Sequence, residues 1–211
     1  MSQSAVPSRK RRKEARPSEL TAAALELFVE KGFAATRLDD VAKRAGVSKG
    51  TLYLYFDSKE ALFKAVIQEG MVPALAEGEA ILARHEGSTF DLLAALLNAW
   101  WTLIGETHLS GIPKLMISEA RNFPEVAQFY YEKVITRGRA LVGAALERGM
   151  ASGEFRPMDV NVYIDVIISP VLMLTVWRHS MACCLQGEPE PREFLAVHLD
   201  LLRRGLLSAR V

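Results

Sequence analysis

The apolar residues of this chain recur at intervals of three and four positions, and no segment shows the two-residue alternation of a half-buried β-strand. Glycine and proline separate the apolar segments, as is typical of helix ends and turns. We therefore expect an all-α fold. The pattern predicts about nine helices, at residues 17–31, 37–45, 49–55, 59–85, 89–106, 109–121, 124–151, 159–184 and 191–208.

The most specific pattern lies between residues 36 and 62. Thr36 is a candidate N-cap for a short helix whose apolar positions follow Leu38 at i+3, i+4 and i+7. Gly46 comes next, where a left-handed residue commonly ends a helix, and Ser48 is the N-cap expected for a second short helix. Two short helices joined by a glycine turn form a helix-turn-helix, whose second helix enters the DNA major groove.

The second helix of this pair carries side chains suited to DNA. Lys49, Thr51 and Tyr53 lie on its outer face beside the bare backbone of Gly50, with no carboxylate among them. Such a set can contact phosphates and base edges. Lys59 begins the following helix, whose N-terminus together with the ammonium group would form an anion site. The alternative is that the tyrosines are half-buried core residues and Lys59 is a solvated surface charge.

This segment resembles the TetR/AcrR family of bacterial regulators. The strongest match is SKGTLYLYFDSKEAL at residues 48–62, preceded by ELTAAALELFVEKGFAATRL, and the specific motif covers about residues 19–63. The resemblance implies a homodimeric DNA-binding regulator, usually a repressor, whose C-terminal helical domain binds a small molecule that lowers operator affinity. Carried over position by position, it places DNA contacts at Arg37, Ser48, Lys49, Gly50, Thr51, Tyr53, Tyr55 and Lys59.

Charge is distributed unevenly along the chain. The formal net charge is only +1, but residues 1–16 hold six basic residues against one acidic residue. This tail is either a flexible, solubilising extension or an arm that adds phosphate or minor-groove contacts, and its position beside the helix-turn-helix favours the arm. We expect a flexible basic arm at 1–16, a DNA-binding domain at 17–64 and a helical ligand-binding and dimerisation domain at 65–211.

The C-terminal region is rich in aromatic and methionine side chains, which can line an adaptable apolar cavity or simply form the core. The candidate ligand contacts are Trp100, Trp101, His108, Met116, Glu119, Phe123, Tyr130, Asp165, Met173 and Trp177. A carboxylate within an apolar stretch makes Asp165 the most unusual of them. It would either orient a cationic or hydroxylated ligand or pair with an arginine across a dimer, and both alternatives are open. The expected effector is hydrophobic or amphipathic.

The last two predicted helices have apolar faces that would form a four-helix interface between two subunits, with a domain-swapped or purely intramolecular packing as the alternative. A homodimer predicts a palindromic operator with half-sites about one DNA turn apart. The apolar stretch at 160–177 is interrupted by Asn161, Asp165 and Pro170, so we expect no membrane span and a cytoplasmic protein. A ligand that shifts the long helix at 59–85 would change the separation of the two recognition helices.

Other functional classes have weaker support. The chain has no nucleophile elbow, zinc-protease motif or Walker loop, and its four histidines lack metal-ligand spacing, so we expect no enzyme, cofactor or metal. An activator or a nucleoid protein without a ligand stays an alternative to the repressor. Adjacent Cys183 and Cys184 are expected to be packing residues, with thiol sensing as the alternative.

Overall fold

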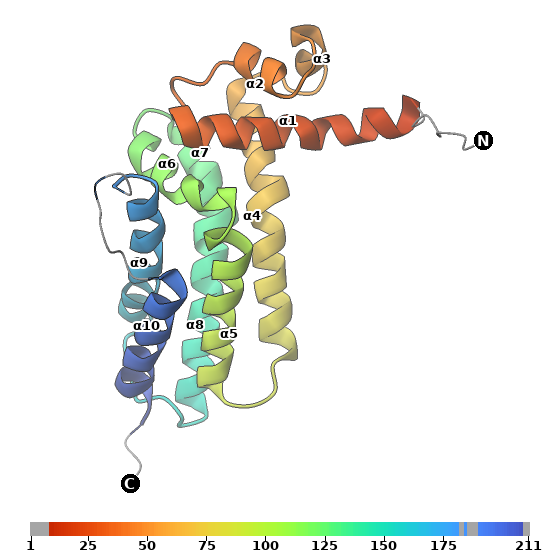
Figure 1. The fold of residues 1–211 in the computed structure, drawn as a ribbon. Coiled ribbons are helices and arrows are strands. Elements are labelled where there is room, and N and C mark those ends of the chain that lie inside the picture. Colours follow the sequence, from red (N-terminus) through yellow and green to blue (C-terminus); the bar gives the residue numbers. More distant parts are fainter. Residues whose placement is uncertain (1–8, 182–183, 185–189, 209–211) are drawn as a thin grey trace, which may run out of the picture. The chain divides into compact units, whose positions relative to one another are not determined.

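The computed structural model describes the chain apart from residues 1–8, 182–183, 185–189 and 209–211, and it describes only the backbone of residues 9–16. The described part is helical, without a β-strand, and its one isolated β-bridge pairs Phe155 with Leu207 (Figure 1). The all-α prediction is therefore confirmed. The chain divides into an N-terminal unit, residues 1–69, and a C-terminal unit, residues 70–211, compared with an expected boundary after residue 64.

The N-terminal unit contains α1 (Arg9–Lys31), α2 (Leu38–Arg44), α3 (Lys49–Tyr53) and the first part of α4 (Lys59–Arg84). Its core includes Phe28, Phe33 and Phe63, whose ring centroids lie 5.3 to 5.4 Å apart. Each ring is buried, and the two contacts of Phe63 are edge-on, the geometry that aromatic quadrupoles favour. This cluster joins α1, the turn after it and α4.

Helix α1 begins at Arg9, earlier than the expected residue 17, and Pro17 lies within it. Arginine, lysine, glutamate and alanine make up residues 9–16, and these residues lose little free energy on entering a helix. The predicted start at residue 17 was wrong because the segment before it, which lacks apolar residues, was interpreted as a flexible tail, whereas residues 9–16 are helical.

The helix-turn-helix follows the local rules with one exception. Gly46 has φ +67°, the left-handed conformation expected at this turn. Ser48 caps α3 by accepting the amide hydrogen of Thr51 at 3.1 Å, as predicted. Thr36 does not cap α2. It is buried, donates to the carbonyl oxygen of Gly32 at 2.7 Å, and leaves the N-cap position to Arg37.

The C-terminal unit is a bundle of long helices. It contains the rest of α4, α5 (Thr89–Trp100), α6 (Gly111–Glu119), α7 (Pro124–Tyr130), α8 (Thr136–Ala151), α9 (Val160–Arg178) and α10 (Pro191–Leu206). Helix α8 packs against α5 and α9, and α10 packs against α9 and α5 (Figure 1). The helix predicted at residues 124–151 corresponds to α7, α8 and the segment between them. If these are counted as one, the described residues contain the nine helices that the sequence predicts.

Two π-helical segments interrupt this bundle, η1 (Trp101–Gly105) after α5 and η3 (Tyr131–Ile135) between α7 and α8, and a short 3-10 helix, η2 (His108–Ser110), precedes α6. A π-helical turn inserts an extra residue, so the side chains after it change the direction in which they point. Pro73 lies inside α4 and does not end it. The expected helix at residues 59–85 is therefore continuous.

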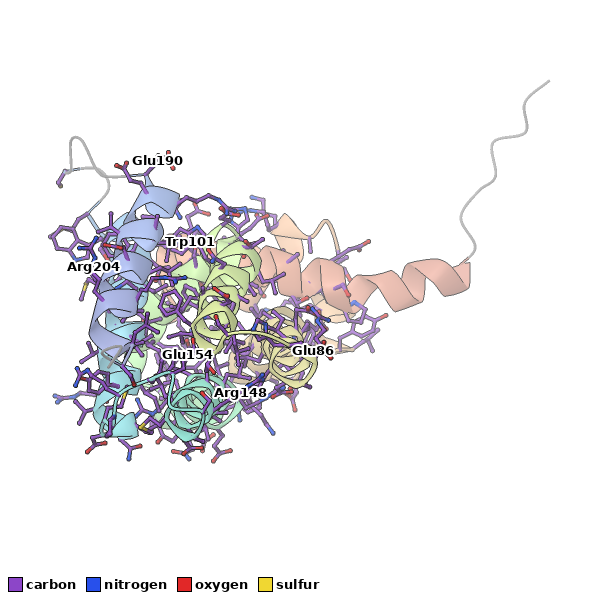
Figure 2. The ribbon with its side chains drawn as sticks, turned by 90° about the horizontal axis from the view of Figure 1, so that it is seen from below. Glu86, Trp101, Arg148, Glu154, Glu190 and Arg204 are labelled. Carbon is purple, nitrogen blue, oxygen red and sulfur yellow. The ribbon has the colours of Figure 1, made fainter. Side chains whose placement is uncertain are left out.

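Side-chain caps hold the end of the bundle at which α5 begins. Glu154, labelled in Figure 2, accepts the amide hydrogens of Thr89 at 2.6 Å and Phe90 at 2.9 Å. Arg148 donates to the carbonyl oxygen of His85 at 3.1 Å, and Ser88 caps α5 through the amide of Asp91. A carboxylate at a helix N-terminus satisfies unpaired amides and favours the helix dipole. These contacts support the helices that surround the cavity described below.

Candidate functional site

Helix α3 presents a polar, exposed face. Leu52 is buried beneath it, whereas Lys49, Tyr53 and Leu54 are exposed, and Leu54 is 82% exposed. A Cβ added to Gly50 would meet only the Ser48 hydroxyl, at 3.9 Å, so the backbone there is open to a close partner. The face combines a cation, a hydroxyl, a phenol and a methyl-bearing side chain, which can contact phosphates, base edges and thymine methyls.

Lys49 is paired with a carboxylate of α2. Its Nζ lies 2.8 Å from Asp39 Oδ1 and 5.9 Å from the centre of the Tyr53 ring. The hydrogen bond that Lys49 donates to Asp39, followed by the charge of Asp39, raises the pKa of Lys49. Both side chains are exposed, so the pair contributes little to stability, but Asp39 competes with any phosphate for this ammonium group.

We expect Asp39→Asn to tighten DNA binding by about three- to tenfold at moderate salt, because it removes a like charge facing the phosphates and releases Lys49. Fluorescence anisotropy with a specific and an unrelated duplex would measure it, and both affinities should rise because phosphate contacts carry no sequence information.

Asp40→Asn is the matched control. It removes the same charge from the same turn of α2, but Asp40 pairs with Lys31 of α1 at 3.3 Å instead of with α3. An equal gain from both variants would show a general charge effect, and a loss of affinity in Asp39→Asn would show that Asp39 positions Lys49.

Lys59 lies at the start of α4, and its ammonium group makes contacts within the N-terminal unit. It donates to the carbonyl oxygens of Phe33 at 2.7 Å and Ala34 at 3.0 Å, and it lies 4.6 Å from the centre of the Phe33 ring. Its interpretation as a freely solvated surface charge is wrong. Arg37 is exposed and Tyr55 is half-buried, and their DNA contacts stay predictions like that of Lys59.

The C-terminal unit encloses a cavity of about 280 Å³ between α4, α5, α7, α8 and α9. Its walls are mostly apolar, with Met71, Leu75 and Leu96 among the lining residues. A Cβ at Gly78 would lie 2.7 Å from a methyl carbon of Leu141, so the Leu141 side chain would have to shift to admit a larger residue there. The charged lining residues are Arg139 of α8 and Asp165 of α9, which form an ion pair.

A second, more open groove of about 470 Å³ shares Tyr130, Ile135 and Leu172 with this cavity. Tyr130 is buried, and burial raises the pKa of its hydroxyl. No hydrogen-bond partner for that hydroxyl occurs among the described residues. Tyr130 lines both pockets and its hydroxyl can donate to a bound molecule, so Tyr130 is a candidate ligand contact.

The structure brings together some of the predicted ligand contacts. Trp100, Tyr130 and Asp165 line the cavity, and Met116 and Tyr130 line the groove. The other predicted contacts line neither of these two pockets: Trp101, His108, Glu119, Phe123, Met173 and Trp177. Trp101 is a core residue beneath the Arg178 guanidinium, 5.7 Å from its ring, while Met173 and Trp177 are exposed on α9.

The sequence patterns did not identify Arg139 as a residue of this site. The feature that could have indicated it is Asp165, because a carboxylate in an apolar stretch requires a partner. Of the two alternatives considered for it, a ligand or an arginine across a dimer, the structure shows neither directly, since the paired arginine belongs to the same chain. Asp165 is also exposed rather than buried. Nothing local in the sequence indicates that residues on α8 and α9 meet there.

Helices α9 and α10 carry an exposed apolar surface, here called the α9–α10 face. It consists of Val162, Val166, Met173, Trp177, Val197 and Leu201. By length and composition, helix α9 could also cross a membrane: its most apolar stretch has a mean hydropathy of 1.8, and 22% of that stretch is buried.

Cys184 follows α9 in the chain and is exposed, so the prediction that it is a packing residue is wrong. Cys183 lies outside the described residues.

Comparison with known proteins gives consistent matches. Residues 20–66 match the model of bacterial regulatory proteins, tetR family, and residues 83–182 match the tetracyclin repressor-like C-terminal domain. The chain is 30% identical over 190 residues to the HTH-type transcriptional repressor KstR2 of Rhodococcus jostii (strain RHA1), covering 89% of this chain and 91% of the relative.

Two solved structures resemble the fold. The transcriptional regulator FadR from Bacillus subtilis, in complex with stearoyl-CoA, has a TM-score of 0.75 at 22% identity, covering 89% of this chain and 98% of that chain. A putative transcriptional regulator from Saccharomonospora viridis, in complex with choline, has a TM-score of 0.76 at 17% identity, covering 93% and 99%. Their ligands are chemically different, so the shared fold leaves the ligand of this chain to its own residues.

Proposed function

This chain belongs to the TetR family of bacterial regulatory proteins, and from that premise we propose a sequence-specific repressor that a small amphipathic ligand releases from its operator. The observation that carries the proposal is the α3 face, where exposed Lys49, Tyr53 and Leu54 flank an open glycine backbone. A capped helix with buried Leu52 beneath it holds this face in place.

In the proposed complex, α3 enters the major groove. Thr51 and Tyr53 contact base edges, Leu54 meets a thymine methyl, and Lys49 exchanges Asp39 for a phosphate. Arg37, at the N-cap of α2, and the amides at the start of that helix contact the backbone of the duplex. Basic residues 9–16, the first part of α1, add sequence-independent affinity.

The proposed assembly is a homodimer through the α9–α10 face. Exposed apolar residues lie one to two turns apart on each helix, and two such helices from each subunit form a four-helix interface. A second copy accounts for the apolar side of α9 without a membrane, and we propose the cytoplasm as the location. The curated relatives are transcriptional regulators, and we propose that this chain is likewise not an enzyme.

The proposed response to ligand runs through α4. This helix begins next to the turn after α1, where Lys59 holds the carbonyl oxygens of Phe33 and Ala34, and it continues into the cavity wall at Met71, Leu75 and Gly78. A ligand that binds between α4 and α8 stabilises one position of α4 over another. Only such differential binding can change the affinity for DNA.

Selection of bound duplexes from random DNA would test the DNA-binding part of the proposal. We expect a palindromic consensus with half-sites about 34–36 Å apart, one turn of DNA. With Tyr53→Ala, the selected consensus should lose its base preference at defined positions of each half-site. Tyr53→Phe would distinguish the contribution of the hydroxyl from that of the ring. Enrichment of no sequence, with binding that depends only on salt, would contradict a sequence-specific regulator.

A further inference from the structure

The polar residues in the lining of the C-terminal cavity indicate what it can bind. Arg139 and Asp165 are the charged residues among its lining side chains, and they pair with each other. Tyr130, a buried residue, adds a hydroxyl to the lining, and that hydroxyl forms no hydrogen bond to another described residue. Ser169 also lines the cavity, but its hydroxyl hydrogen is used within α9, where it is donated to the carbonyl oxygen of Asp165 at 2.6 Å.

The two members of the ion pair are unequally exposed. The side chain of Asp165 is 64% exposed and that of Arg139 is 32% exposed. Asp165 can therefore turn into solvent at little cost, whereas the less exposed guanidinium stays at the cavity wall. An incoming anion can take the place of Asp165, but an incoming cation would approach Asp165 against the permanent charge of Arg139.

Tyr130 strengthens this preference. Burial raises the pKa of its hydroxyl, which therefore stays protonated and can donate a hydrogen bond. A carboxylate accepts hydrogen bonds and has no proton to donate, so it suits a lining whose donors are the Tyr130 hydroxyl and the Arg139 guanidinium. The remaining walls, including Met71, Leu75 and Leu96, offer only apolar contacts.

Building on the proposed function, we infer that the effector is an amphipathic carboxylate whose head group displaces Asp165 from Arg139 while its apolar chain fills the cavity. The cavity volume of about 280 Å³ is near the lower end of ligand sites, about 300–1,000 Å³, and indicates a short or medium chain. A longer chain would continue into the groove through the shared wall at Tyr130, Ile135 and Leu172.

Three probes of equal chain length and different head charge test the inference: decanoate, decanol and decylamine, each below its micellar concentration. Isothermal titration calorimetry on the full chain measures binding without DNA, and Trp100, which lines the cavity, gives a fluorescence signal. We expect decanoate to bind at least about tenfold more tightly than either of the others, as for a charge-assisted hydrogen bond.

Asp165→Asn is the decisive variant. It removes the competing carboxylate, so decanoate affinity should rise by about three- to tenfold while that of decylamine falls and that of decanol stays constant. Arg139→Gln should abolish the preference for decanoate. Arg137→Gln is the matched control, because Arg137 lies on the same helix but pairs with Glu79 at 2.8 Å and does not line the cavity.

Equal binding of decanoate and decanol, binding of none of the three probes, or weaker decanoate binding by Asp165→Asn would overturn the inference. None of these outcomes touches the selection of DNA duplexes, so the failure of the ligand assignment is distinguishable from failure of the proposed repressor. Release of a selected duplex by decanoate but not by decanol would support both together.

Discussion

Leu201→Asp should convert the protein from a dimer to a monomer and lower its affinity for a palindromic operator by about 10²- to 10⁴-fold, the range over which two linked binding sites exceed one. Leu201 is 62% exposed on α10 in the single chain and belongs to the α9–α10 face. In a four-helix interface the introduced carboxylate would be buried without a partner, at a cost of several kcal/mol.

The same substitution should leave the fold of each subunit intact, because an exposed position contributes little to the stability of the single chain. Light scattering with size-exclusion chromatography would give the mass, and anisotropy with full and half operators would give the affinities. Binding of a half operator should not change, since α3 itself is untouched.

Ile117→Asp is the control for introducing a charge at an exposed apolar side chain. Ile117 is 70% exposed but lies on α6, outside the α9–α10 face, so this variant should stay dimeric. A dimeric Leu201→Asp protein would contradict the proposed interface, as would a wild-type chain that is monomeric at micromolar concentration.

The sequence predicted the helix-turn-helix well because short-range rules determine it. Gly46 adopts the left-handed turn, and Ser48 and Ser58 cap the helices that follow them, all within four residues of their partners. Thr36 did not follow the predicted rule because its hydroxyl turns back to the end of α1. Its oxygen lies 2.7 Å from the carbonyl oxygen of Gly32 and 3.1 Å from that of Leu27, so it does not cap α2.

The ligand cavity was predicted less well, since lining and core residues have the same composition. Trp100 lines the cavity, whereas its neighbour Trp101 is 1% exposed and belongs to the core. Successive side chains of an α-helix point about 100° apart. The π-helical segment that begins at Trp101 changes the direction in which the side chains after it point. Arg139 was not predicted because its partner Asp165 is on another helix.

Phe63→Ala should destabilise the N-terminal unit by about 3–5 kcal/mol, the usual cost of truncating a buried aromatic ring. Phe63 is 1% exposed and packs edge-on against Phe28 at 5.3 Å and Phe33 at 5.4 Å. Small domains have stabilities near the low end of about 5–15 kcal/mol, so this loss removes most of the margin. DNA binding should fail at 37 °C while the C-terminal unit stays folded.

Two optical signals separate the units. The three tryptophans, Trp100, Trp101 and Trp177, all lie in the C-terminal unit, so their fluorescence reports its unfolding alone, whereas circular dichroism reports both units. In Phe63→Ala, urea should cause an early loss of helical signal that precedes the fluorescence transition. Phe63→Leu is the control: it keeps an apolar side chain of similar volume and should lower the free energy of unfolding by only about 1–1.5 kcal/mol.

Coincident transitions in Phe63→Ala would mean that α4, which is continuous through the unit boundary, makes the two units unfold together. In that case a ligand in the cavity would also stabilise the DNA-binding unit against urea.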